Sequence, residues 1–253
     1  MKRNIKLTIE YDGTNFNGWQ IQRAGTRTIQ GEIEKALHKI FNEKITLIGS
    51  GRTDSGVHAL GQVANFLTHN TRLSTTEILN ALNANLPEDI SILKSEDVPQ
   101  KFHAQYSAKR KTYRYCILNR KERCSIQRDF NTFIPYKLNL TAIQTEAKNL
   151  IGRKDFRAFT AANPAERNAS IEKNTVRTIY KFQIQKKGAY LYIDIEANGF
   201  LYKMVRNIVG TLLEVGSAKL SKGSVKRILL QKDRSLAGST APAKGLCLIK
   251  VTY

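Results

Sequence analysis

The stretch TIQGEIEKALHKIFNEKITLIGSGRTDSGVHALGQVANFL, residues 28–67, predicts a helix, a strand, a glycine-rich loop and a second strand in succession. Apolar residues from Ile29 onward recur at helical spacing, and Thr28 can cap the start of that helix. We expect strands at residues 45–48 and 63–67, on either side of the loop. The stretch therefore indicates a mixed α+β domain.

The segments before and after this stretch continue the succession of strands and helices. Apolar and polar residues alternate over residues 5–9, which predicts a strand. A capping box formed by Ser74 and Glu77 predicts a helix that ends at Pro87, and a strand is expected at residues 90–93. This half of the chain thus reads β-α-β-β-α-β, the order of a ferredoxin-like domain.

The second half repeats the order without a matching sequence repeat. We expect strands at residues 113–117, 176–184, 191–195 and 246–253, and helices at residues 140–151, 204–213 and 225–229. The prediction is therefore an α+β fold of two ferredoxin-like (βαββαβ) domains, residues 1–105 and 106–253. A basic cleft between the two domains would be a common place for a ligand site.

The charge of the chain points to an anionic partner. The sequence contains 41 Lys and Arg residues against 21 Asp and Glu residues, a formal net charge of +20. Nucleic acid is the first candidate, because cations that neutralise phosphates release counterions, and an anionic membrane surface is the second. No apolar run of about 18 residues and no signal-like start is present, so we expect a cytoplasmic protein.

The cysteines and histidines show no ligand spacing. Cys116, Cys124 and Cys247 form neither a C-x-x-C motif nor an even disulfide set, so we expect reduced thiols and no metal site.

The loop GSGRTDSG, residues 49–56, is the strongest candidate for chemistry. Its three glycines allow a sharp turn or a close approach to another molecule, and they enclose Arg52 and Asp54. Such a loop can present a carboxylate from a rigid sheet. The alternative is a solvated turn in which the aspartate caps local amides.

Blocks of residues spread over nearly the whole chain resemble the tRNA pseudouridine synthase A (TruA) family, in the order of that family. They are GRTDSGVH at 51–58, YDGTNF at 11–16 with GWQ at 18–20, NANLP at 83–87, FHAQYSA at 102–108, KTYRY at 111–115 and FLYKMVRNIVG at 200–210. The resemblance implies isomerisation of uridine to pseudouridine at positions 38, 39 and 40 in the anticodon stem-loop of tRNA. It also implies an enzyme without a cofactor that forms a homodimer.

The resemblance assigns roles to three residues. Asp54 matches the catalytic aspartate, which can attack the sugar, attack the uracil ring or remove a sugar proton; the sequence leaves these routes open. Tyr113 matches the tyrosine that packs against the target uracil, although its alternation with Tyr115 and Ile117, taken without the resemblance, favours a strand core. Arg206 matches the basic partner of the aspartate, with an exposed helix charge as the alternative.

Further residues are predicted to contact tRNA. Nine basic residues and four aromatic residues are interleaved in residues 101–128, a composition typical of an RNA surface or, alternatively, of a solvated face. By resemblance, the substrate contacts are Arg52, which would assist base extrusion, with Arg72, Phe102, His103 and Lys121. His58 has no assigned role, and we expect it to pack within the loop.

Two other functional classes fit parts of the sequence. A non-catalytic RNA-binding protein or chaperone would explain the charge but would leave Asp54 and Arg206 without a role. A nuclease or base hydrolase is the other alternative, but a metal nuclease needs clustered carboxylates, and Asp54 has no partner of that kind nearby in the sequence.

Overall fold

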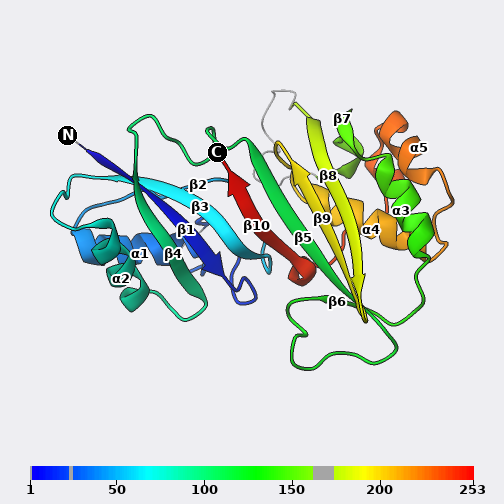
Figure 1. The fold of residues 1–253 in the computed structure, drawn as a ribbon, viewed down its shortest axis with the longest axis horizontal. Coiled ribbons are helices and arrows are strands. Elements are labelled where there is room, and N and C mark those ends of the chain that lie inside the picture. The colour runs from blue at the N-terminus through cyan, green and yellow to red at the C-terminus, as the bar shows by residue number, and fades with distance from the viewer. Residues whose placement is uncertain (1, 23–24, 162–173) are drawn as a thin grey trace. The chain divides into compact units, whose positions relative to one another are not determined.

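The computed structural model describes residues 2–22, 25–161 and 174–253 of a mixed α+β chain (Figure 1). These residues fall into two compact units: the first comprises Met1–Lys109 with Cys247–Tyr253, and the second comprises Arg110–Leu246. Within the described ranges, no helix is both long and apolar enough to cross a membrane.

The first unit is a sheet with two helices. Its elements are β1 (Arg3–Tyr11), α1 (Ile29–Phe41), β2 (Ile48–Gly49), β3 (His58–Thr68), α2 (Thr75–Asn85), β4 (Ile90–Val98) and β10 (Leu246–Thr252). β1 lies between β4 and β3 and is antiparallel to both. The other edge of β3 is shared, because antiparallel β2 bonds to its later part and parallel β10 to its start.

Two predictions for this unit were wrong in extent or place. The strand expected at residues 45–48 shrinks to two residues, because Glu34 and Gln30 of α1 bind the backbone N–H and C=O of Leu47 at 2.8 and 3.0 Å. The last strand of the chain was expected in the C-terminal domain but belongs to the first unit. Short β2 leaves the start of β3 uncovered, and Cys247 of β10 pairs there with His58.

The core of the first unit lies between the sheet and its helices, and α1 and α2 lie behind β1, β3 and β4 in Figure 1. Ile5 and Leu7 of β1 are fully buried, while Lys6 between them points to the opposite face, as a period of two requires. Phe66 of β3 meets Phe41 of α1 edge to face at 5.7 Å. The predicted capping box of α2 is present.

The described residues of the second unit form a sheet and three α-helices. Its elements are β5 (Arg110–Asn119), β6 (Thr132–Ile134), α3 (Leu140–Lys148), β7 (Gly152–Asp155), η1 (Arg157–Phe159), β8 (Val176–Lys187), β9 (Tyr190–Ala197), α4 (Met204–Gly216), α5 (Ser224–Gln231), η3 (Arg234–Leu236) and η4 (Ala243–Gly245). The strand order is β5-β9-β8-β7, and β6 pairs in parallel with β5. The prediction missed β6 and β7, since three or four residues are too few to show alternation.

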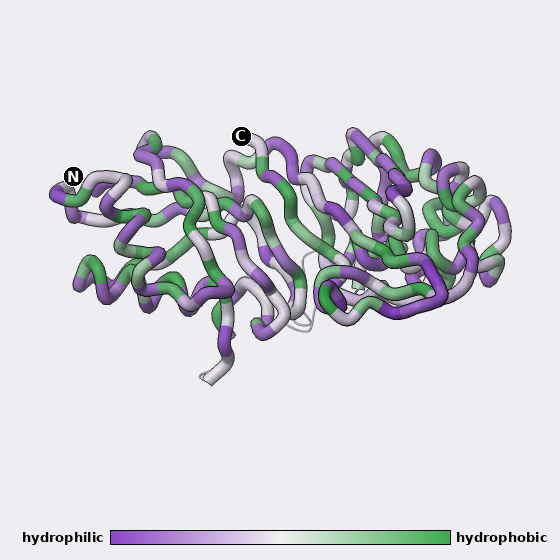
Figure 2. Tube along the Cα trace, turned by 60° about the horizontal axis from the view of Figure 1, so that its bottom comes forward, coloured by the Kyte–Doolittle hydropathy of each residue, from purple (hydrophilic) through white to green (hydrophobic). Residues whose placement is uncertain are grey.

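The two faces of this second sheet differ in chemistry, and Figure 2 shows hydrophobic and hydrophilic positions alternating along the strands. Tyr115 of β5 is opposite Ile193 of β9, and both are buried. The other face carries ion pairs, for example Arg114 with Asp194 at 2.7 Å. Tyr113 lies on the same side of β5 as Tyr115, and only 8% of its surface is exposed.

Candidate active site

The Asp54 loop, residues 50–57, connects β2 to β3 and is fastened to β3 at its start. The backbone N–H of Ser50 donates to the carbonyl of Val63 at 2.7 Å, and the Ser50 hydroxyl donates to Gln62 Oε1 at 2.6 Å. The amide of Gln62 donates in turn to the carbonyl of Gly51 at 3.0 Å. Gln62 is fully buried, so this end of the loop cannot shift without leaving buried polar groups unsatisfied.

A second set of contacts fixes Thr53, the residue directly before Asp54. The Thr53 hydroxyl lies 2.8 Å from the hydroxyl of Tyr11, and the Thr53 carbonyl accepts from the backbone N–H of Trp19 at 3.1 Å. Burial raises the pKa of Tyr11, so its hydroxyl stays neutral and able to donate. Asp54 itself is half-buried, whereas Arg52 is exposed with Nε 3.1 Å from Gln20 Oε1.

Two glycines let the segment between β1 and α1 lie directly on the loop. A Cβ at Gly18, whose φ is +88°, would lie 2.6 Å from the carbonyl oxygen of Thr53. A Cβ at Gly13 would collide with the carbonyl oxygen of Val57. Only the family resemblance pointed to Gly13 and Gly18, and their support of the loop was not predicted, although the spacing of these glycines was an available signal.

His58 at the start of β3 packs beneath the same segment. Its Nδ1 accepts from the backbone N–H of Gly13 at 3.1 Å, an arrangement that places the ring proton of the neutral form on Nε2. Asp12 Oδ1 lies 3.1 Å from the same nitrogen and would gain a hydrogen bond only from the protonated ring. This environment supports a packing role for His58.

In the second unit, Tyr113 lies near the start of β5 against an aromatic partner. Its ring meets that of Phe200 edge to face, with centroids 5.1 Å apart and an interplanar angle of 89°. Phe200 belongs to the segment that leads into α4. The contact fixes the orientation of the Tyr113 ring.

Arg206, the third residue of α4, is half-buried and tied to a neighbouring segment. Its Nε donates to the carbonyl of Ala241 at 2.8 Å, and the N–H of Ala241 donates back to the carbonyl of Arg206 at 3.1 Å. Burial raises the pKa of Tyr115, and the Thr132 hydroxyl and the positive charge of Arg206 offset part of that rise. The charge of Arg206 therefore acts on Tyr115 of β5, two residues along the strand from Tyr113.

A buried polar cluster holds residues 234–241 against α4. Asn207 Oδ1 accepts from the Thr240 hydroxyl at 2.6 Å and from Arg234 Nη2 at 3.2 Å. A Cβ at Gly210 would collide with the carbonyl of Ser239. This clamp positions Ala241, and hence Arg206, and the sequence reading did not detect it.

Lys111 opens the KTYRY block and was given no role of its own, yet it lies in an unusual environment. It precedes Tyr113 by two residues and therefore shares its strand face. Burial, with a contribution from the charge of Arg177, lowers the pKa of Lys111 to about 8.

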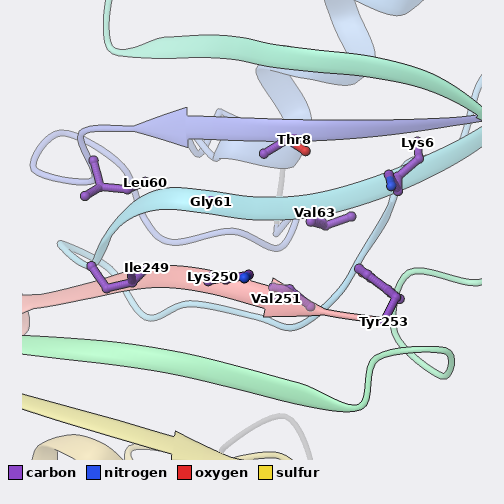
Figure 3. Close-up of a pocket in the computed structure, with 9 residues that line it drawn as sticks. All are labelled: Lys6, Thr8, Leu60, Gly61, Val63, Ile249, Lys250, Val251 and Tyr253. Carbon is purple, nitrogen blue, oxygen red and sulfur yellow. The ribbon is translucent and has the colours of Figure 1, made fainter. Parts of the chain in front are cut away.

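The remaining predicted tRNA contacts are distributed over both units. Arg72, Phe102 and His103 lie in the first unit and Lys121 in the second, and Arg72 and Lys121 are exposed. The face of the first sheet opposite its helices has a hollow of about 300 Å³ lined by β1, β3 and β10 (Figure 3). Lys6 and Lys250 lie at this hollow, and Lys6 forms an ion pair with Glu96 at 2.8 Å.

Asp54 belongs to the first unit, and Tyr113 and Arg206 belong to the second. Throughout the described part of the chain, no three His, Cys, Asp or Glu side chains are grouped so that they could hold a metal ion.

A strongly basic α+β chain that carries a half-buried carboxylate on a braced loop has the features of an enzyme that acts on nucleic acid. The family described as tRNA pseudouridine synthase matches residues 7–107 and 147–253. Proteins named tRNA pseudouridine synthase A from Thermoanaerobacter sp. (strain X514), Caldicellulosiruptor bescii and Clostridium acetobutylicum are 48%, 45% and 45% identical, each over 99% of this chain and 100% of the relative. The chain belongs to the tRNA pseudouridine synthase family and is an isomerase that acts on uridine in tRNA.

Proposed function

We propose that this protein converts uridine to pseudouridine at positions 38, 39 and 40 in the anticodon stem-loop of tRNA, with Asp54 as its catalytic carboxylate. The observation that carries the proposal is the double fastening of the Asp54 loop, by Gln62 on one side and by Tyr11 and Trp19 on the other. A catalytic group works best when its supporting residues are themselves fixed. A solvated turn would not need this support.

The proposed chemistry uses a single carboxylate. The glycosidic bond from C1′ to N1 breaks with its electron pair going to N1, the uracil rotates, and a bond from C1′ to C5 forms. C5 then loses its proton and N1 gains one, so the product is an isomer of the substrate. We propose that the Tyr113 ring packs against the uracil and that Arg206 orients Asp54 as its ion-pair partner. The fixed geometry of Tyr113 against Phe200, and of Arg206 on Ala241, supports these roles.

The proposed binding surface is electrostatic and aromatic. Arg52 would fill the gap left by the extruded uridine, and the other contacts would be Arg72, Phe102, His103 and Lys121. We also propose that the fold consists of two ferredoxin-like domains with a basic cleft between them. The element order β1-α1-β2-β3-α2-β4 of the first unit supports the ferredoxin-like architecture. The protein is further proposed to be cytoplasmic and to form a homodimer. Light scattering of the purified protein would test whether it is a dimer.

The test is Asp54→Asn compared with Glu88→Gln, an exposed acid in the same unit. Both variants remove one negative charge, so both should bind tRNA at least as tightly as the wild type. Only Asp54→Asn should abolish tritium release from tRNA labelled at C5 of uridine. Turnover retained by Asp54→Asn would refute the assignment, and a product that lacks its base would indicate a hydrolase instead.

A further inference from the structure

Tyr106 presents its ring to solvent on a platform. It is 79% exposed, which is uncommon for so large a ring, and it stacks on His103 with centroids 4.3 Å apart and an interplanar angle of 29°. One face of the ring is therefore supported by protein. Stacking from the opposite side would bury the second face.

The turn that carries Tyr106 is closed by its own hydrogen bonds. His103 Nδ1 accepts from the backbone N–H groups of Gln105 and Tyr106 at 3.2 and 3.3 Å. The backbone N–H of His103 donates to the Ser107 hydroxyl at 3.1 Å, and the N–H of Ser107 donates to the carbonyl of His103 at 2.9 Å. The backbone around Tyr106 is thus ordered before any partner binds, so binding costs less conformational entropy.

The turn is anchored to the open face of the first sheet. The N–H of Ala104 donates to Asn65 Oδ1 at 2.8 Å, and the carbonyl of Ala104 accepts from the Tyr253 hydroxyl at 2.8 Å. Asn4 also connects this segment to β3, since its amide donates to the carbonyl of Phe102 at 3.0 Å and its Oδ1 accepts from Asn65 at 2.9 Å. Asn4 and Asn65 are buried, so the anchor is part of the core.

The surroundings of Tyr106 are cationic. Residues 99–109 contain no acidic residue, and Lys101 and Lys109 are both exposed. A nucleotide offers a π face for the ring and a phosphate for the lysines, whereas an apolar protein surface would match only the ring.

We propose that the exposed face of Tyr106 is a stacking site for a nucleobase of the bound tRNA, with Lys101 and Lys109 contacting the adjacent backbone. The identity of the RNA rests on the proposed function. Ala104 docks at Asn65 of β3, whereas the Asp54 loop leads into the start of that strand at His58. Thr53, next to Asp54, contacts Tyr11, which pairs with Ala59 of β3. Ala59 and Asn65 are six residues apart, roughly 20 Å along a strand. In the proposal the stacked base is therefore a nucleotide other than the target uridine.

This distance makes the inference specific, because the site should affect binding and leave the chemical step unchanged. Tyr106→Ala should weaken tRNA binding about tenfold at fixed salt, whereas Tyr106→Phe and Tyr106→Trp, which keep an aromatic face, should bind within about twofold of the wild type. The rate of pseudouridine formation at saturating tRNA should be the same in all three variants. Tyr136→Ala, which removes another half-exposed ring, is the matched control and should bind as the wild type does.

Salt dependence separates stacking from charge. Tyr106→Ala should leave the slope of log affinity against log salt unchanged, while Lys101→Ala combined with Lys109→Ala should make it shallower, by about 0.7 for each single-strand phosphate that the protein no longer neutralises. The inference is overturned if Tyr106→Ala binds normally, or if Tyr106→Phe loses as much affinity as Tyr106→Ala, which would indicate a hydroxyl contact. If the wild-type protein forms no pseudouridine, the proposed function fails instead.

Discussion

The hydroxyl of Tyr11 lies 2.8 Å from the hydroxyl of Thr53, the residue that directly precedes the candidate catalytic Asp54. Both side chains are buried, so the contact joins the end of β1 to the loop through the interior of the first unit. Motif residues that are far apart in the sequence therefore act as one support for a single carboxylate.

Tyr11→Phe removes this contact while keeping the ring. We expect a loss of about 1 kcal/mol in the free energy of unfolding, because the Thr53 hydroxyl loses its partner in a buried position. The rate at saturating tRNA should fall several-fold with little change in tRNA affinity. Urea unfolding and single-turnover assays measure the two effects, and Tyr180→Phe, at an exposed tyrosine, is the control.

Gly18→Ala and Gly25→Ala form a matched pair. Both glycines have positive φ, +88° and +86°, so both substitutions should cost about 1 kcal/mol in backbone strain. Only at Gly18 would the new Cβ meet the loop, since among the described residues no atom lies within 4 Å of a Cβ at Gly25. Gly18→Ala should therefore lose additional stability and activity. Equal stability and activity in the two variants would show that the close contact between Gly18 and the Asp54 loop is unimportant.

Arg206→Lys keeps the charge but removes the Nε donor that holds the side chain on Ala241. We expect the rate of pseudouridine formation to fall at least about tenfold, because a flexible ammonium cannot reproduce the fixed fork of a guanidinium. Arg227→Lys, an exposed position on α5, should have no effect. Wild-type rates in Arg206→Lys would mean that the reaction needs only a positive charge at this position and not the Nε donor.

The lowered pKa of Lys111 predicts that the difference in stability between the wild type and Lys111→Met depends on pH. Burial lowers its folded-state pKa to about 8, from an ordinary value of 10.5, so the unfolded chain binds more protons between these two values. Wild-type stability relative to Lys111→Met should therefore rise with pH across this window, by up to about 1.4 kcal/mol per unit. Urea unfolding of both proteins at pH 7.5 and 9.5 measures the change. A difference that stays constant would contradict the lowered pKa.

Local patterns in the sequence were sufficient for most elements. The capping box at Ser74 and Glu77 correctly predicted α2, and the alternating runs at residues 176–184 and 191–195 correctly predicted strands β8 and β9. These elements depend on neighbouring residues, through capping and through period-two burial. The family blocks likewise identified Asp54, Tyr113 and Arg206 as candidates, because motif recognition needs only the order of residues.

Tertiary structure alone decided where β2 begins, where β10 pairs and what supports the candidate residues. Leu47 leaves the strand because side chains of α1 bind its backbone, and β10 reaches the start of β3 from the far end of the chain. The contacts of Thr53 with Tyr11 and of Arg206 with Ala241 join residues 42 and 35 positions apart. Such contacts depend on how the chain returns to itself in three dimensions, and no local periodicity or propensity encodes that path.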